Sequence, residues 1–225
     1  YSLFGYEHLK YNCIRIFFSG ENLQPDFNLC DYAIGYSHID FYDRYLRFPL
    51  YFLYKEDYQK ALNKHHITDD EIKEKKKFCN FVYSNNKADP IRETFFKKLS
   101  LYKVVDSGGR YLNNIGGSIE NKMQFLSKYK FSITFENTST NGYTSEKLIQ
   151  GFAAGSIPIY WGNPIIKQEF NTKAFVNCHD YSSLEEVIEA VIRIDNDENL
   201  FKAYLKEPIS LETENQSKEK ELHTF

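Results

Sequence analysis

The densest group of polar side chains lies between residues 131 and 162, where the sequence reads FSITFENTSTNGYTSEKLIQGFAAGSIPIYWG. Its apolar runs predict a strand over Phe131–Phe135 and another over Ile157–Tyr160, with a polar loop and a helix over Ser145–Ala154 between them. A helix N-terminus offers free N–H groups and a partial positive charge, which suit phosphate. The segment therefore predicts an anion site where this helix begins.

Four side chains near this helix start are candidates for chemistry, and each has a structural alternative. Glu146, in the first turn, either stabilises the helix dipole or accepts hydrogen bonds from a ribose diol. Lys147 is electrostatically disfavoured in that turn, which favours an anionic ligand such as a diphosphate. Tyr143 is either a packing ring or a wall of the ligand pocket, and Asn137 is either a loop cap or a ligand contact.

Strands and helices alternate from residue 78 onward, which predicts βαβ units and an α/β fold with a parallel sheet. Such sheets bind ligands at the carboxyl ends of their strands, so the site is expected just after the strands that end at Tyr83 and Phe135. The other elements predicted here are strands over Phe78–Tyr83, Val104–Val105 and Ala174–Val176 and helices over Ile91–Leu99, Asn121–Tyr129 and Leu184–Ile194.

The first part of the chain has a different pattern. Short strands are predicted over Cys13–Phe18 and Tyr32–Tyr36, and residues 55–77 are so highly charged that they indicate one or more exposed helices. We therefore divide the chain into two domains, residues 1–77 and residues 78–225.

The composition is that of a soluble globular protein, with 42% hydrophobic and 26% charged residues. The formal net charge is −3 and no broad basic face is evident, so nucleic acid is not an expected partner.

Aromatic residues reach 17%. Surplus Tyr is common where sugars bind, but codon usage also produces it. The four cysteines form no C-x-x-C pair, which gives no zinc signal and fits a reduced, cytoplasmic compartment, although a disulfide stays open.

The two ends of the chain carry little information on function. No apolar run is long enough to span a bilayer, and no signal peptide opens the chain. The chain begins at Tyr1 without Met, so we expect that an upstream segment is missing. The tail from Glu212 is polar and charged and is expected to be frayed or a cut end.

The polar segment resembles the signature of the α1,3/4-fucosyltransferases, and the similarity to the bacterial branch of this family extends over most of residues 12 to about 205. Ser145 stands where the family usually has Thr, which keeps a helix-capping hydroxyl. The matching residues are Phe131 with Glu136-Asn137, Gly142 to Leu148, Ile157 to Gly162, Ser19 to Asn22, Asp31 to Gly35, Asp43 to Leu50, Pro90 to Arg92 and Phe175 to Asn177. Several ordered motifs are far more specific than one short pattern.

The resemblance implies a GT-B architecture, in which two Rossmann-like domains face each other across the active-site cleft. Residues 1–77 would then be an N-terminal, acceptor-side domain that lacks its first strands, and residues 78–225 the donor domain with a polar tail. The implied activity is transfer of L-fucose from GDP-fucose to a GlcNAc hydroxyl of a lactosamine-type glycan, in α1,3 or α1,4 linkage. Two alternatives stay open: a GT-B transferase that uses another nucleotide sugar, and a catalytically silent module that binds a glycan or a nucleotide.

The resemblance also assigns roles to residues. Glu21 would be the general base of a single displacement with inversion at the fucose anomeric carbon, although a Glu in a turn is by default a surface residue. Arg92 and Lys147 would neutralise the diphosphate, although Arg92 by default faces solvent in its helix. Glu146 would bind the ribose hydroxyls. Asn137 and Tyr143 are the other two residues expected to contact the donor.

No obligatory metal is expected, while stimulation by Mn²⁺ or Mg²⁺ that pairs with GDP stays open. Asp195-Asn196-Asp197 mimics the D-x-D metal motif of other glycosyltransferases, but its position predicts a turn at a helix end. The expected partners are GDP-fucose and an N-acetyllactosamine-like acceptor. The family's bacterial branch further implies lipopolysaccharide or capsular glycans, Lewis-antigen products and peripheral contact with the inner membrane.

Overall fold

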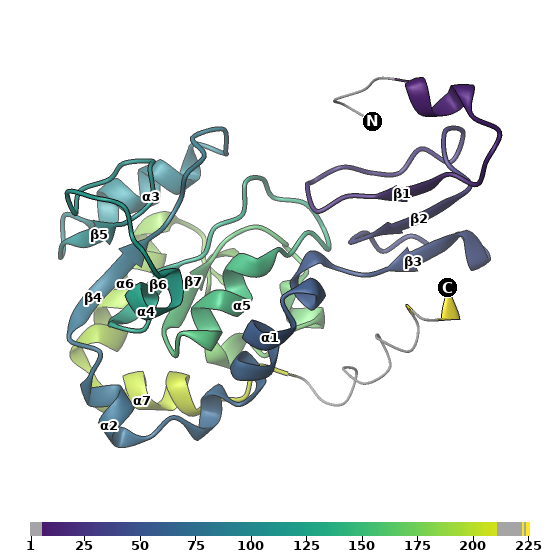
Figure 1. Cartoon of the computed structure of the whole chain (residues 1–225). Coiled ribbons are helices and arrows are strands. Elements are labelled where there is room, and N and C mark those ends of the chain that lie inside the picture. Colours follow the sequence, from purple (N-terminus) through teal and green to yellow (C-terminus); the bar gives the residue numbers. More distant parts are fainter. Residues whose placement is uncertain (1–5, 211–221, 223) are drawn as a thin grey trace.

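The computed structural model describes residues 6–210, 222, 224 and 225, so the tail predicted from Glu212 lies almost wholly outside the described residues. Two parallel β-sheets form two units that are joined by a helical segment (Figure 1). The predicted α/β class is therefore confirmed. Within the described ranges, every helix is too short or too polar to cross a bilayer.

The larger unit contains a five-stranded sheet in the order β5-β4-β6-β7-β8, with all neighbours parallel. Numbered within this sheet the order is 2-1-3-4-5, so the chain reverses its direction of winding between β4 and β6, where open α/β sheets bind their ligands. The strands are β4 (Lys77–Phe81), β5 (Val105–Ser107), β6 (Tyr129–Ile133), β7 (Ile157–Tyr160) and β8 (Val176–Asn177).

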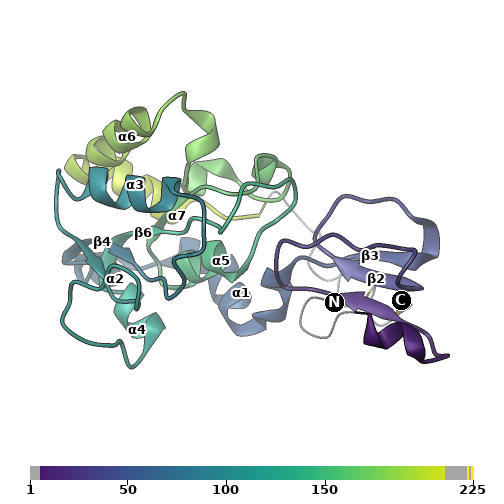
Figure 2. The same cartoon turned by 90° about the horizontal axis from the view of Figure 1, so that it is seen from above.

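Helices cover both faces of this sheet (Figure 2). On one face, α3, α6 and α7 bury apolar side chains in a core shared with the strands. On the other face, α5 contacts both β7 and α1, and it packs next to α4. The helices of this unit are α3 (Ile91–Leu99), α4 (Lys122–Leu126), α5 (Glu146–Ala153), α6 (Leu184–Asn196) and α7 (Glu198–Lys206).

The smaller unit is a three-stranded parallel sheet in the order β1-β2-β3. Its strands are β1 (Ile16–Phe18), β2 (Tyr32–Gly35) and β3 (Tyr45–Arg47). Phe17, Ala33 and Tyr45 are buried in its small core. Both outward side chains of β1, Ile16 and Phe18, are more than half exposed.

The segment between the sheets packs on the larger unit. Helix α1 (Lys55–Leu62) lies against α5, where Tyr58 and Ala61 share a core with Leu148 and Phe152. We predicted exposed helices for residues 55–77. In the structure, α1 of this segment has one buried face. The short helix α2 (Asp69–Lys73) follows and leads into β4. By packing this segment belongs with the larger unit, while the domain division at residue 77 stays a prediction.

Several other elements differ from the sequence prediction. Strand β3 was not predicted, α4 ends at Leu126 and not at Tyr129, and β6 runs over Tyr129–Ile133 and not over Phe131–Phe135. The strand expected over Ala174–Val176 starts later, because Asn171 caps a 3-10 turn over Thr172–Ala174 and the chain becomes extended only at β8. Helix α7 was not predicted. It begins at once after α6, because the side chain of Asp197 accepts a hydrogen bond from the Leu200 N–H and starts a new helix.

Candidate active site

A cleft of about 950 Å³ opens at the carboxyl ends of β4, β5 and β6. It lies at the edge of the sheet predicted from the strand pattern, and the start of α5 forms part of its wall. Five of the six predicted site residues line it, and one of them comes from the smaller unit: Glu21, Arg92, Asn137, Glu146 and Lys147. The structure therefore brings together residues that lie more than a hundred positions apart in the sequence.

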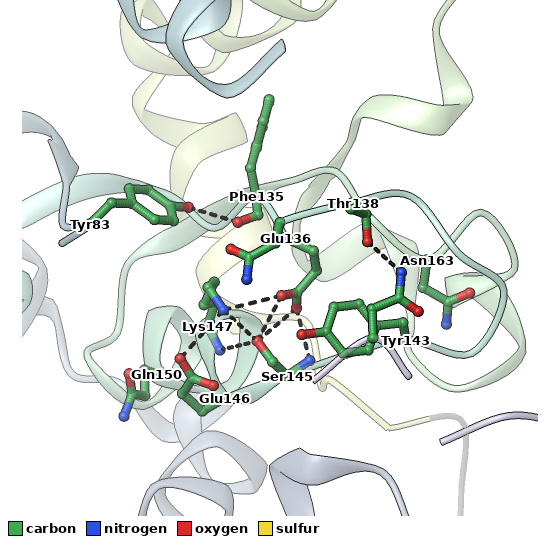
Figure 3. A network of polar contacts seen from close by, with 12 residues as sticks. Tyr83, Phe135, Glu136, Thr138, Tyr143, Ser145, Glu146, Lys147, Gln150 and Asn163 are labelled. Atoms are coloured by element: carbon green, nitrogen blue, oxygen red, sulfur yellow. Dashed lines mark hydrogen bonds and ion pairs between the residues drawn. The ribbon is translucent and has the colours of Figure 1, made fainter. Parts of the chain in front are cut away.

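The start of α5 is held by a buried carboxylate that the sequence analysis did not select. Glu136 follows β6, has no exposed surface, and accepts hydrogen bonds from the Ser145 N–H at 2.8 Å and the Ser145 hydroxyl at 2.7 Å (Figure 3). Its Oε2 also accepts from Lys147 Nζ at 3.2 Å. Glu136 thus fixes both the helix cap and the lysine. Its only sequence signal was its position at the strand end, inside the Glu-Asn motif.

Lys147 is held in its charged form. Burial acts against the charge, but the carboxylates of Glu136 and Glu146 outweigh it and raise the pKa of the Lys147 amine above its ordinary value. The amine lies 3.5 Å from Glu146 Oε1 and its side chain keeps 19% of its surface exposed, toward the cleft. A fixed cation therefore faces the cavity, as an anionic ligand requires.

Glu146 is held as an anion beside it. Burial would raise its pKa, but Lys147 and Lys122 outweigh burial and the pKa of Glu146 falls below its ordinary value. Lys122 also lines the cleft and donates to Gln150 Oε1 at 2.6 Å, and burial lowers the pKa of its amine. Sequence reasoning missed Lys122, because a lysine in a short polar helix carries no local signal of a site.

Arg92 is buried, with 1% of its surface exposed, which differs from the default of a solvent-facing arginine. Its Nη2 donates to the Phe135 carbonyl at 3.0 Å and to Asn137 Oδ1 at 2.8 Å, and its guanidinium lies 4.0 Å from the centre of the Tyr83 ring. Nε and Nη1 are buried and have no hydrogen-bond partner among the residues that the structure describes. Buried donors are rarely left unpaired, so these two are suited to a ligand in the cleft.

Glu21 reaches the same cleft from the smaller unit. It lies in the turn after β1, where its N–H donates to Ser19 Oγ at 3.0 Å and its carbonyl accepts from the Leu23 N–H at 2.7 Å. The side chain is exposed, as a base that meets an incoming hydroxyl must be. A carboxylate on one wall therefore opposes the cations of the other wall.

Tyr143 is placed differently from the other five. It is buried, with 2% of its surface exposed, and it is not among the side chains that line the cleft. Its ring packs edge-to-face on Tyr36 of the smaller unit at a centroid distance of 5.0 Å. This is the packing alternative left open by the sequence, while a contact between Tyr143 and the donor stays a prediction.

The Asp195-Asn196-Asp197 segment lies at a helix end as expected, but Asp195 and Asn196 still belong to α6 and Asp197 alone separates it from α7. Asp195 pairs with Lys130 at 2.8 Å and with Lys103 at 2.5 Å, and Asp197 caps α7. Within residues 6–210, 222, 224 and 225, no group of three or more His, Cys, Asp and Glu side chains could hold a metal ion.

Comparisons with known proteins agree with this geometry. The model of the alpha-(1,3)-fucosyltransferase FucT N-terminal domain matches residues 1–54, and that of glycosyltransferase family 10 (fucosyltransferase) C-term matches residues 72–224. A crystal structure of an α1,3-fucosyltransferase with GDP-fucose aligns with a TM-score of 0.82 and 35% identity, covering 94% of this chain and 73% of that one.

Two curated relatives show the range of similarity. The alpha-(1,3)-fucosyltransferase FucT of Helicobacter pylori is 37% identical over 84% of this chain and 46% of its own length. The human GDP-fucose protein O-fucosyltransferase 3 is 26% identical over 86% of this chain and 42% of its own length. The chain thus spans less than half the length of either relative.

The fold and the cleft define a GT-B-type α/β protein, in which residues of both parallel-sheet units line a cleft that contains the cationic side chains of Arg92 and Lys147. The chain belongs to glycosyltransferase family 10, the fucosyltransferases. The predicted family resemblance is therefore confirmed.

Proposed function

We propose that the protein is an inverting fucosyltransferase that uses GDP-fucose. The observation that carries this proposal is the cleft itself, in which an ionised Glu146, a charged Lys147 and the two unpaired donors of Arg92 face a common space with Glu21. Solved relatives bound to GDP and to GDP-fucose, at 35% identity, support the choice of donor.

In the proposed reaction Glu21 takes the proton of the acceptor hydroxyl. At the same time the oxygen of that hydroxyl attacks the anomeric carbon of fucose. The bond from that carbon to the β-phosphate oxygen breaks, and GDP leaves with the bonding electron pair. Arg92 and Lys147 stabilise the charge that develops on the diphosphate, and Glu146 accepts hydrogen bonds from the ribose hydroxyls. Attack from the side opposite to the leaving group inverts the anomeric configuration.

Calorimetry with GDP and UDP tests the donor class, and linkage analysis of products tests the reaction. The full-length protein is incubated with GDP-fucose and either type 1 or type 2 disaccharides, with a peptide acceptor in parallel, because one relative is named as a protein O-fucosyltransferase. Binding of GDP without UDP and fucosylation of a disaccharide support the proposal. Binding of UDP, or nucleotide binding without turnover, would replace it with one of the two alternatives.

The acceptor and the setting belong to the same proposal. An N-acetyllactosamine-like glycan of lipopolysaccharide is the proposed acceptor, with Lewis-type products, a cytoplasmic location and peripheral contact with the inner membrane. These rest on the resemblance to bacterial members of the family. Stimulation by Mn²⁺ or Mg²⁺ is tested by adding each ion and EDTA to the same assay, and unchanged rates would remove it from the proposal.

A further inference from the structure

Asn22 joins the two sides of the cleft directly beside Glu21. Its amide nitrogen donates to Thr138 Oγ1 at 2.5 Å and to Thr140 Oγ1 at 2.7 Å, both in the loop that follows β6. Its amide oxygen accepts a hydrogen bond from the Tyr36 hydroxyl. Burial raises the pKa of Tyr36, so this phenol stays protonated and donates. The two donated bonds therefore link the smaller unit to the larger one, while the bond accepted from Tyr36 holds the amide within the smaller unit.

The loop that receives Asn22 also carries the donor-side residues. Asn137, which accepts from Arg92, directly precedes Thr138, and Tyr143 packs on Tyr36 three residues beyond Thr140. At Gly142 the backbone has a φ of +80°, and a Cβ there would lie 2.7 Å from the Tyr36 carbonyl oxygen. The loop is thus fitted closely to the smaller unit on both sides of the amide contact.

We propose that Asn22 is a positioning residue that holds Glu21 at the cleft by fastening the turn over residues 19–23 to the loop over residues 138–140. The inference rests on the proposed function, because it assigns Asn22 a role in placing the base of that reaction. Glu21 itself has an exposed side chain, and the hydrogen bonds of its backbone within the described part of the chain are local turn bonds with Ser19 and Leu23. The amide of the next residue therefore supplies the contact that fixes the turn relative to the donor side.

Loss of this amide should leave the protein folded. The two units are also joined by the ion pair between Arg47 of β3 and Glu169 of the larger unit, at 2.8 Å. Asn28 offers a matched control, since it lies in the same unit and both its backbone N–H and its side-chain amide donate to the nearby Asp26 Oδ1.

The main test compares three variants of the full-length protein: Asn22→Ala, a double variant that combines Thr138→Val with Thr140→Val, and Asn28→Ala. Each of the first two should lower kcat for fucosyl transfer about 10- to 100-fold, because a misplacement of a catalytic group by about 1 Å costs that much. The KM for GDP-fucose and the affinity for GDP should stay within about twofold, and Asn28→Ala should leave kcat within about twofold. Adding Asn22→Ala to Glu21→Gln should cause no further loss, since the positioned group is then already absent.

Two results would overturn the inference: a kcat within twofold of wild type in Asn22→Ala, or a loss of GDP affinity in step with kcat, which a general structural defect would produce. Hydrogen exchange gives a readout that needs no substrate. The amides of residues 19–23 should exchange faster in Asn22→Ala and Thr138→Val/Thr140→Val but not in Asn28→Ala. If the wild type does not use GDP-fucose, the proposed function fails, whereas unchanged exchange in residues 19–23 refutes the fastening itself.

Discussion

The pKa of Lys147, at the carboxyl end of the larger sheet, is shifted in the opposite direction from that of two lysines at the amino end. At the carboxyl end, Lys147 lies against Glu136 and Glu146, and its pKa is raised in spite of burial. At the amino end, burial lowers the pKa of Lys75 to about 8 and that of Lys64 to about 7.

The difference lies in the partners. Lys75 donates to the carbonyls of Ser127 and Ala154, at the ends of α4 and α5, and Lys64 donates to two carbonyls in the last turn of α7. Such contacts satisfy helix ends but supply no full counter-charge. Lys147 therefore keeps its charge because two carboxylates lie beside it, whereas Lys64 and Lys75 contact carbonyls alone among the groups just named.

The largest expected effect is on kcat and concerns Glu21, which lies across the cleft from Lys147. Glu21→Gln removes the base without changing the shape of the side chain, so kcat should fall about 10²- to 10⁴-fold while GDP affinity is kept. Steady-state kinetics and calorimetry measure the two quantities. Glu7→Gln, an exposed residue of the same unit that pairs with Lys10, is the control and should stay within about twofold. A similar rate in Glu21→Gln and the control would place the base elsewhere.

The second prediction concerns the counter-charge that distinguishes the two ends. Glu136→Gln should lower the free energy of unfolding by about 3 kcal/mol, because it removes one member of a buried charged network around Lys147 and Ser145. Urea unfolding measures this. The control is Glu198→Gln, which breaks a surface pair with Lys202 and should cost less than about 1 kcal/mol. An equal loss of unfolding free energy in the two variants would show that Glu136 is not a stabilising counter-charge of Lys147.

The third prediction compares the two kinds of lysine directly. Lys147→Ala should weaken GDP binding by about 1.5–3 kcal/mol, the size of a charge-assisted hydrogen bond. Lys75→Ala should leave GDP affinity unchanged, because its amine lies at the opposite end of the sheet. Calorimetry at one salt concentration measures the GDP affinity of both variants and of the wild type. Should both variants bind GDP like the wild type, Lys147 has no role at the diphosphate.

The smallest effect is a pH dependence that comes from the amino end. Lys64 and Lys75 have folded pKa values of about 7 and about 8, below the ordinary 10.5, so above pH 7 the unfolded chain binds more protons than the folded chain. Their contribution to the free energy of unfolding therefore rises with pH, by about 1–2 kcal/mol between pH 7 and pH 8.

Urea unfolding at these two pH values measures the rise, in a window below the ordinary pKa of the cysteine thiols. Lys64→Met should flatten it, since a side chain of similar length then carries no proton. A rise of the same size in Lys64→Met would assign the pH dependence to other groups, and stability that falls with pH would contradict the assignment of both lysines.

The amino-acid sequence by itself determined the local structure and the family. The strand Ile157–Tyr160 has the predicted bounds, and α5 starts where Ser145 provides its cap, since both depend on apolar pattern and capping within a few residues. The alternation of strands and helices from residue 78 onward predicted the cleft at the carboxyl edge of the sheet. Each of these signals is a local pattern of residue types along the chain.

Only the tertiary structure decided which polar groups meet. Glu136 as counter-charge, the burial of Arg92 against Tyr83 and the contact of Asn22 with a loop 116 residues away depend on how the two sheets pack. Burial and distant charges also set whether a lysine keeps its proton. Local sequence rules describe interactions between near neighbours in the chain, so they could name the residues of the cleft but not the contacts that fix their charges and positions.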